Sequence, residues 1–442
     1  MGHIEIIDEK HAASEPSWSC GLSGAYLGAL GFRDSSLLVH GSSGCGFAMR
    51  YGLSPHWKSF IPCPVTSFGE DDVIFGGKNL LERGIKQIEQ SNPSSALFVL
   101  TACSTEIIGE DVQGAAAEAS RRFGKPVIGV DSGGATGNTI DGYNNFLLRT
   151  VETLYPPPMA SGQFISEGPP RIDVMGILPY YDMFWRGDIR EIRRLLQQVG
   201  IELNGVLSGD CSLDTIGRAN ETSLTATLCK HIGQRALLRI KNRRKGRVHF
   251  AQVAPIGIEF TRKWIEEIVD CVGLLDKAHV AILDAEEEKA REIMLRGFDF
   301  SKVMFTSGRA AVIGKSSLAI GLVNFLTNEL GMRVVMVAFT NRPDQAEMAI
   351  LEEILRRRGN STRVLIDQDG ETVRRQLVEI RPNIVFGRST DRVAELSATT
   401  AFVTWQFPST DRLVVYDRPF MGFKGVTSIV DDVINALSRI WY

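Results

Sequence analysis

Ser36-Leu-Leu-Val-His40-Gly-Ser-Ser-Gly-Cys45-Gly46 joins a short apolar run to a glycine-rich turn that carries a cysteine. Ala96-Leu-Phe-Val-Leu-Thr101-Ala-Cys103-Ser-Thr-Glu106 has the same organisation. Each stretch predicts a buried strand whose carboxyl end leads into a helix. Strand-like runs alternate with helix-like stretches along almost the whole chain, which indicates largely parallel sheets. We therefore expect an α/β fold of three doubly wound Rossmann-like domains with parallel sheets around a central cleft.

The chain has 442 residues and is too long for one hydrophobic core. A proline-rich segment, Pro156-Pro-Pro158, and the Gly/Ser/Pro-rich residues up to Pro170 indicate a linker after the first unit. The expected domains are residues 1–160, 168–297 and 298–425, followed by a C-terminal helix at 426–442. The expected strands are residues 36–40, 96–101 and 126–131, then 171–178, 205–210, 223–229 and 247–251, and finally 302–306, 333–338, 362–366 and 382–386.

The composition excludes several classes of function. Apolar residues make up 44% of the chain and charged residues 23%, which is ordinary for a globular protein. A net charge of −3 gives no signature of polyanion binding, so nucleic acid is not an expected partner. No signal-peptide pattern and no run of about 18 uncharged apolar residues occurs, so neither export nor a membrane span is expected. Seven cysteines at irregular spacing do not resemble a disulfide framework, and we expect a cytoplasmic protein.

Three cysteines, Cys20, Cys45 and Cys103, are candidate metal ligands. Cys45 and Cys103 each follow the carboxyl end of an expected strand and precede an expected helix, where ligands bind in open α/β sheets. Helix N-termini stabilise negative charge and lower the pKa of a thiol. Several thiolates in one crevice of a reducing compartment favour an iron–sulfur cluster. The alternative is three inert, buried thiols, since a free cysteine behaves as a small apolar residue.

Two further motifs concern the second and third units. Cys229 ends the strand-like run Ser223–Cys229 and precedes Lys230 and His231, whose polarity leaves a ligand role open beside a simple core role. The stretch from Gly308 to Ser316 resembles a phosphate-binding loop but has five residues, not four, between its glycines. A strand-to-helix turn explains that stretch better than nucleotide hydrolysis.

The first 115 residues resemble the nitrogenase component 1 superfamily, and weaker matches extend the resemblance over nearly the whole chain. In the second unit, Ser208-Gly-Asp210 precedes Cys229 by the interval at which α-type nitrogenase subunits place their cofactor-ligating cysteine. The third unit matches loosely, through residues 382–387 and 419–425. The first-unit motifs are Cys20-Gly-Leu-Ser-Gly-Ala25, His40-Gly-Ser-Ser-Gly-Cys45-Gly46, Ser67-Phe-Gly-Glu-Asp-Asp-Val-Ile-Phe-Gly-Gly77 and Thr101-Ala-Cys103-Ser-Thr-Glu-Ile-Ile-Gly-Glu-Asp111.

The resemblance implies two iron–sulfur groups. Cys20, Cys45 and Cys103 would hold a cluster of P-cluster type at the interface with a homologous β-type subunit. Cys229 would anchor a complex iron–sulfur cofactor of nitrogenase type, with its heterometal left open. The implied assembly is a heterotetramer that receives electrons from an ATP-dependent iron–sulfur reductase protein. The implied function is that of an α-type catalytic subunit similar to methylthio-alkane reductases, which cleave carbon–sulfur bonds of small molecules.

Departures from the family pattern argue against dinitrogen reduction. Nitrogenase carries a second cofactor ligand, a His, near its C-terminal Gly-rich loop, whereas this chain has no His after His279. Tyr143 stands where molybdenum nitrogenase carries a His that assists protonation. Tyr143 and His231 are therefore the candidate catalytic proton donors, although a core role suits either of them equally well. The alternative functions are a cofactor-assembly scaffold and a tetrapyrrole reductase, and the presence of Cys229 argues against the second.

Overall fold

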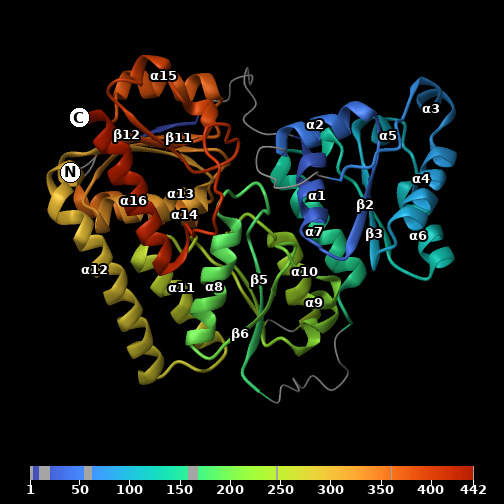
Figure 1. Cartoon of the computed structure of the whole chain (residues 1–442), viewed down its shortest axis with the longest axis horizontal. Coiled ribbons are helices and arrows are strands. Elements are labelled where there is room, and N and C mark those ends of the chain that lie inside the picture. Colours follow the sequence, from blue (N-terminus) through green and yellow to red (C-terminus); the bar gives the residue numbers. More distant parts are fainter. Residues whose placement is uncertain are drawn as a thin grey trace.

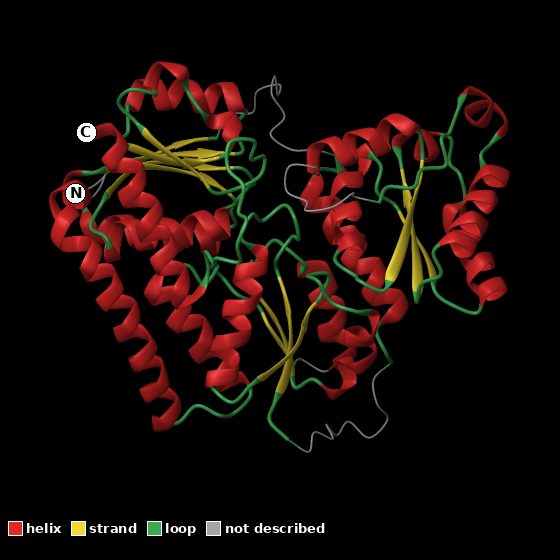
Figure 2. Ribbon diagram, in the orientation of Figure 1, coloured by secondary structure: helices red, strands yellow, loops and turns green. Residues whose placement is uncertain are grey.

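The computed structural model describes residues 3–8, 20–53, 62–157, 168–244, 247–359 and 361–441. It consists of three lobes, each built on a parallel sheet with helices against it (Figures 1 and 2). The first sheet has the order β2-β3-β4, formed by Ser35–His40, Ala96–Thr101 and Val127–Val130. All of its strand pairs are parallel, which confirms the expected α/β class.

The second and third sheets are also entirely parallel. The second has the order β6-β5-β7-β8, formed by β5 (Arg171–Met175), β6 (Glu202–Val206), β7 (Leu224–Thr227) and β8 (Val248–His249). The third has the order β1-β11-β10-β9-β12-β13, formed by β1 (Ile4–Ile7), β9 (Arg309–Gly314), β10 (Arg333–Phe339), β11 (Thr362–Ile366), β12 (Ile384–Gly387) and β13 (Ala401–Thr404).

Several segments differ from the sequence expectation. The expected strand at 205–210 is β6, which lies earlier at Glu202–Val206, and β13 was not expected. Strand β1 pairs with β11 in the third sheet, so Ile4–Ile7 do not lie in the first unit, and both ends of the chain meet in the third lobe (Figure 1). Residues 302–306 are helical and end α12 (Lys277–Ser307), which crosses the expected domain boundary at 297. A short apolar run does not by itself distinguish a strand from a buried helix segment, and here it continues a long helix. Most of the expected linker, residues 158–167, lies outside the described residues.

The helices cover the sheets on both faces. Gly308–Ser316 is the expected strand-to-helix turn, because β9 runs through Lys315 directly into α13 (Ser316–Asn324). The last helix, α16 (Gly422–Trp441), starts slightly earlier than expected. The others are α1 (Gly21–Leu30), α2 (Ser43–Leu53), α3 (Glu70–Phe75), α4 (Lys78–Ser91), α5 (Cys103–Ile107), α6 (Val112–Phe123), α7 (Thr139–Leu154), α8 (Trp185–Gln198), α9 (Leu213–Gly217), α10 (Gln234–Arg244), α11 (Gly257–Cys271), α14 (Gln345–Arg358) and α15 (Gly370–Ile380).

Two glycines allow α1 and α7 to cross at backbone contact. A Cβ on Gly24 would lie 1.7 Å from the carbonyl oxygen of Thr139, and one on Gly142 would lie 1.8 Å from that of Gly21. No side chain fits at either position without moving the helices apart. This crossing fixes Cys20, which precedes α1, against the loop that precedes α7.

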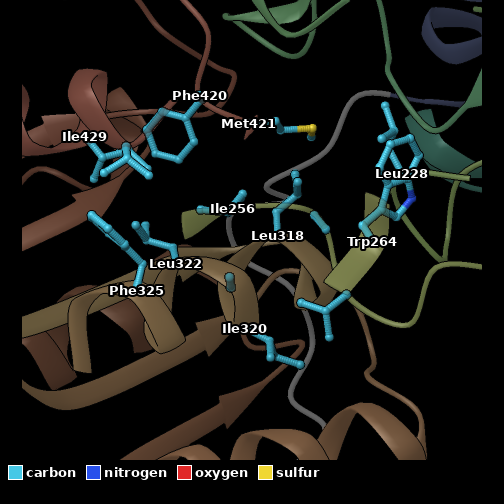
Figure 3. Packing of buried hydrophobic residues seen from close by; sticks show 14 of the residues in the cluster. Leu228, Ile256, Trp264, Leu318, Ile320, Leu322, Phe325, Phe420, Met421 and Ile429 are labelled. Atoms are coloured by element: carbon cyan, nitrogen blue, oxygen red, sulfur yellow. The ribbon is translucent and has the colours of Figure 1, made fainter. Parts of the chain in front are cut away.

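The apolar core joins the lobes in pairs. Leu228 and Trp264 of the second lobe lie in one buried cluster with Leu318 and Phe325 of the third (Figure 3). A second cluster joins the first lobe to the second and contains Cys229. The three lobes therefore fix one another through continuous packing. No helix in the described part of the chain is long and apolar enough to span a bilayer.

A buried carboxylate on α8 holds the start of α16, and it predicts a pH dependence of stability. Asp188 Oδ1 accepts hydrogen bonds from the amides of Phe420 (2.6 Å) and Met421 (2.8 Å). Burial raises the pKa of Asp188 to about 7 from its ordinary 3.8. The pKa of Asp188 is higher in the folded chain than in the unfolded chain. Its contribution to the free energy of unfolding is therefore full below about pH 4 and is lost as the pH rises through about 7.

We therefore expect the melting temperature to fall between pH 5 and pH 8, and Asp188→Asn to reduce that fall. The amide oxygen of Asn accepts both bonds and does not titrate. Scanning calorimetry of the wild type and Asp188→Asn across this pH range measures how much stability each protein loses. The two losses should differ by a few kcal/mol at most. Glu329, whose pKa burial also raises to about 7, leaves a residual slope in both proteins. Parallel pH profiles would contradict the assignment to Asp188.

Candidate metal centre

Cys20, Cys45 and Cys103 all lie at helix N-termini of the first lobe, as the sequence predicts. Cys20 is the residue before α1, Cys45 lies in the first turn of α2 after β2, and Cys103 opens α5 after β3. Cys103 is exposed, whereas Cys20 and Cys45 are partly buried. Since none of the three is sealed inside the core, all can reach a group bound at the surface of this lobe.

The loop between β4 and α7, residues 131–138, brings Cys20 and Cys103 together. The amide of Gly134 donates a hydrogen bond to Cys103 Sγ at 3.0 Å. A Cβ built on Gly134 would lie 3.0 Å from that sulfur and 3.8 Å from the Cβ of Cys20. Cys20 also forms an antiparallel bridge with Asn138 at the end of the loop. Gly134 therefore lies between the two cysteines and leaves no room for a side chain of its own.

Cys45 lies beside a fourth cysteine that has a different character. Cys63 Sγ is 3.6 Å from where a Cβ on Gly46 would stand, so it packs against the turn that carries Cys45. Burial raises the pKa of the Cys63 thiol to about 11, which keeps it protonated, as expected of a packing residue. Cys45 Sγ lies 3.6 Å from Ser42 Oγ. Among the described residues, no three His, Cys, Asp or Glu side chains form a site for a single ion.

Two polar networks that sequence reasoning missed support these cysteines. Glu106 Oε1 accepts hydrogen bonds from Thr101 Oγ1 (2.5 Å) and from the amide of Gly133 (2.6 Å). His40, fully buried at the end of β2, contacts Thr66 Oγ1 at 3.0 Å and Glu110 Oε2 at 3.4 Å. Burial lowers the pKa of His40 and so favours its neutral form. The sequence signal for both networks was the position of His40, Thr101, Glu106 and Glu110 within the motifs that carry Cys45 and Cys103.

The first lobe carries a set of exposed apolar side chains. They lie on the two cysteine-bearing helices, α2 and α5, and on α3 at the outer edge of the lobe (Figure 1). The most exposed are at 83%, and two aromatic rings on α2 stack at a centroid distance of 5.9 Å. A surface of exposed apolar side chains is typical of protein-interaction sites. We call it the apolar face; its members are Phe47, Tyr51, Val73, Ile74, Phe75 and Ile107.

Cys229 lies just after the carboxyl end of β7, in the apolar cluster that joins the first and second lobes, and close to Lys315 of the third lobe. It is fully buried, and burial raises the pKa of its thiol to about 11, while the nearby positive charge of Lys315 acts in the opposite direction. Lys315 Nζ lies 3.1 Å from Asp182 Oδ1 and 4.4 Å from the centre of the Tyr181 ring. The centre of the molecule therefore holds one buried thiol and one buried ammonium group.

The two candidate proton donors are both engaged in hydrogen bonds. His231 Nε2 lies 2.8 Å from Glu347 Oε2 and 2.9 Å from Ser316 Oγ, which ties the second lobe to the third. Tyr143 is fully buried and donates to the carbonyl of Ile177 at 3.0 Å. Burial raises the pKa of Tyr143 well above its usual value, which makes its hydroxyl a weaker acid. This geometry favours a structural role for Tyr143, whereas His231 lies near Cys229 in sequence and in space.

The chain is similar to known proteins over almost its whole length. The family model for nitrogenase component 1 type oxidoreductases matches residues 20–438. The chain is 25% identical to a nitrogenase molybdenum-iron protein beta chain of Methanococcus maripaludis, covering 100% of this chain and 98% of that one. It is 23% identical to an alpha chain of Methanothermobacter thermautotrophicus, covering 95% and 87%.

A solved structure, nitrogenase Cp1 at pH 6.5, superposes with a TM-score of 0.82 at 21% identity, over 98% of this chain and 95% of that one. This likeness establishes the fold. The beta chain is the more similar of the two relatives, so the comparison does not support the α-type role expected from Cys229.

Proposed function

The chain belongs to the nitrogenase component 1 type oxidoreductase family, and on this premise we propose that it is an electron-relay subunit holding half of an iron–sulfur cluster. Cys20, Cys45 and Cys103 supply three thiolates, and a homologous subunit supplies the rest. Two such pairs form a heterotetramer, and an ATP-dependent iron–sulfur reductase protein delivers the electrons. The reducing cytoplasm suits thiolate ligands.

One observation carries the proposal: the amide of Gly134 lies between Cys103 and Cys20 and donates to a cysteine sulfur. Backbone N–H groups directed at sulfur are what an iron–sulfur cluster needs, because they stabilise the negative charge on its ligands. Cys103 is exposed, and Cys20 and Cys45 are only partly buried, so none of the three thiols is sealed inside the core. The residues present therefore fit a cluster shared with a second chain.

The bound cluster would accept and pass on single electrons. The chain's own residues fix where this happens. The α1–α7 crossing holds Cys20 in place, the Gly134 amide orients Cys103 Sγ, and Ser42 lies beside Cys45. The apolar face, once covered by a partner, excludes water from the thiolates and lowers the local dielectric constant, which helps to set the reduction potential.

The outer part of the apolar face is proposed as the docking surface of the reductase. Phe47 and Tyr51 share α2 with Cys45, and Ile107 shares α5 with Cys103, so the subunit that shares the cluster is proposed to cover them. The others lie on α3, with Ile74 at 71% and Phe75 at 83% exposure. An aromatic side chain this exposed, on a scaffold held at Gly77 by Glu110 (3.2 Å), has the character of a binding hot spot.

We expect Phe75→Asp to raise the reductase concentration that gives half-maximal electron transfer by about tenfold or more. Stopped-flow titration of the complex with the reductase measures this concentration. The spectrum of the cluster should not change, because Phe75 is 83% exposed and lies on α3, which carries none of the three cysteines. Leu275→Asp, which alters a side chain 45% exposed on the second lobe, is the matched control. Equal behaviour of the two variants would remove α3 from the docking surface.

A narrower proposal adds a catalytic role. Cys229 would anchor a complex iron–sulfur cofactor, with Lys315 stabilising the thiolate and His231 supplying protons, in an α-type subunit that reduces methylthio-alkanes. It is supported by a buried thiol beside a buried ammonium group. The greater similarity to a beta chain favours the electron-relay role instead. A cofactor-assembly scaffold would use the same cysteines.

Metal analysis of the anaerobically purified complex tests both levels of the proposal. Iron and sulfide per protomer, combined with electron paramagnetic resonance spectra, should reveal the interface cluster. Iron in excess of that cluster, with a second spectrum, is expected only from the catalytic proposal. Turnover of a volatile thioether to a thiol and a hydrocarbon separates an enzyme from a scaffold. A complex without iron would overturn the electron-relay proposal itself.

A further inference from the structure

Glu106 holds the loop whose backbone contacts the sulfur of Cys103. Glu106 Oε1 accepts a hydrogen bond from the amide of Gly133, and the amide of the next residue, Gly134, donates to Cys103 Sγ. Thr101 Oγ1 donates to the same Oε1 and also accepts the amide of Ser132 at 2.8 Å. Three successive amides, 132 to 134, are thereby fixed from β3, from Glu106 and from the cysteine.

The fit between Glu106 and Gly133 is close. A Cβ on Gly133 would lie 2.3 Å from Glu106 Oε2, and one on Gly134 would lie 3.0 Å from Cys103 Sγ. The loop is also held from its other side, since Thr136 Oγ1 bonds the carbonyl of Gly133 at 2.7 Å. Two consecutive glycines offer no side chain that could hold the backbone in one conformation. The Glu106 carboxylate, which lies outside the loop, fixes it instead by accepting the Gly133 amide.

We propose that Glu106 is a positioning residue that fixes the Gly133–Gly134 backbone so that the Gly134 amide donates to Cys103 and raises the reduction potential of the bound cluster. Hydrogen bonds to a ligand sulfur stabilise the more negative, reduced cluster. The effect on potential rests on the proposed function, whereas the effect on the loop does not. The negative charge of Glu106 opposes the hydrogen bond, because a nearby anion disfavours reduction.

Two variants separate the hydrogen bond from the charge. Glu106→Gln keeps an oxygen that accepts from Thr101 and Gly133 but removes the charge, so the potential should rise. Glu106→Ala removes both, so its potential should lie below that of Glu106→Gln. Anaerobic redox titration followed by electron paramagnetic resonance measures both potentials. Glu118→Ala, at an exposed position on α6 of the same lobe, is the control and should match the wild type.

Amide hydrogen exchange provides a readout that needs no cluster. Exchange resolved to Gly133 and Gly134 should be about tenfold faster in Glu106→Ala and near wild type in Glu106→Gln. Thr101→Val should accelerate it as well, which keeps the test available if Glu106→Ala fails to fold. Equal exchange rates in Glu106→Ala, Glu106→Gln and the wild type would overturn the inference. A chain that shows the exchange pattern but binds no iron would overturn only the proposed function.

Discussion

Replacing Cys103 with alanine is expected to remove the interface cluster and to lower electron transfer through the complex by at least about 100-fold. Alanine cannot ligate a metal. Cys63, which packs against the turn that carries Cys45, cannot replace the lost ligand, because burial keeps its thiol protonated. Cys103 is exposed, so its loss removes little packing, and the unfolding free energy of the chain should change by no more than about 0.5 kcal/mol. Iron content, the resonance spectrum and the melting temperature of the purified complex measure these effects.

Cys271→Ala is the control for this experiment. Cys271 is also exposed, but it ends α11 in the second lobe, far along the chain from the candidate centre. This variant should keep all iron and all activity. If Cys103→Ala kept the cluster spectrum and the full iron content, Cys103 would not be a ligand. If it lost iron only through loss of fold, its melting temperature would fall together with its iron content.

Most of the architecture could be predicted from the alternation of strand-like and helix-like runs. Strand β3 reproduces the expected 96–101 run, and β11 the expected 362–366 run. Ile4–Ile7 could not be placed, because its pairing with β11 joins residues more than 350 positions apart and no local pattern encodes such a contact. The expected strand at residues 302–306 is wrong, because three consecutive apolar residues, Val303 to Phe305, suit a strand as well as the end of a long helix.

The sequence also located the candidate ligands but not the groups that position them. Cys45 and Cys103 could be recognised because each follows a buried strand, a pattern visible within a dozen residues. The contact of Glu106 with Gly133 and the contact of His40 with Glu110 depend on how separate loops fold together. Tyr143 illustrates the reverse case: its position matched a catalytic residue of the family, yet its hydroxyl bonds the backbone of the second lobe.

Replacing Cys229 with alanine should separate the two levels of the proposed function. If Cys229 anchors a catalytic cofactor, the variant should lose that cofactor's iron and lower substrate reduction by at least about 100-fold, while the interface cluster keeps its spectrum. Cofactor binding must deprotonate a thiol whose pKa is about 11 in the bare chain, so incorporation should release a proton and weaken at low pH. Iron analysis and turnover assays of the same preparation give both results.

Cys211→Ala is the matched control, because Cys211 is also buried in the second lobe and burial raises its pKa to about 12. Each substitution leaves a small cavity that costs about 1 kcal/mol, so a difference between the two variants in iron or turnover cannot come from packing. If the two behaved alike, with wild-type iron and electron transfer, Cys229 would be a core residue and the chain an electron-relay subunit. Loss of both spectra in Cys229→Ala alone would contradict the proposed division of the cysteines into two sites, because that division assigns the interface cluster to cysteines of another lobe.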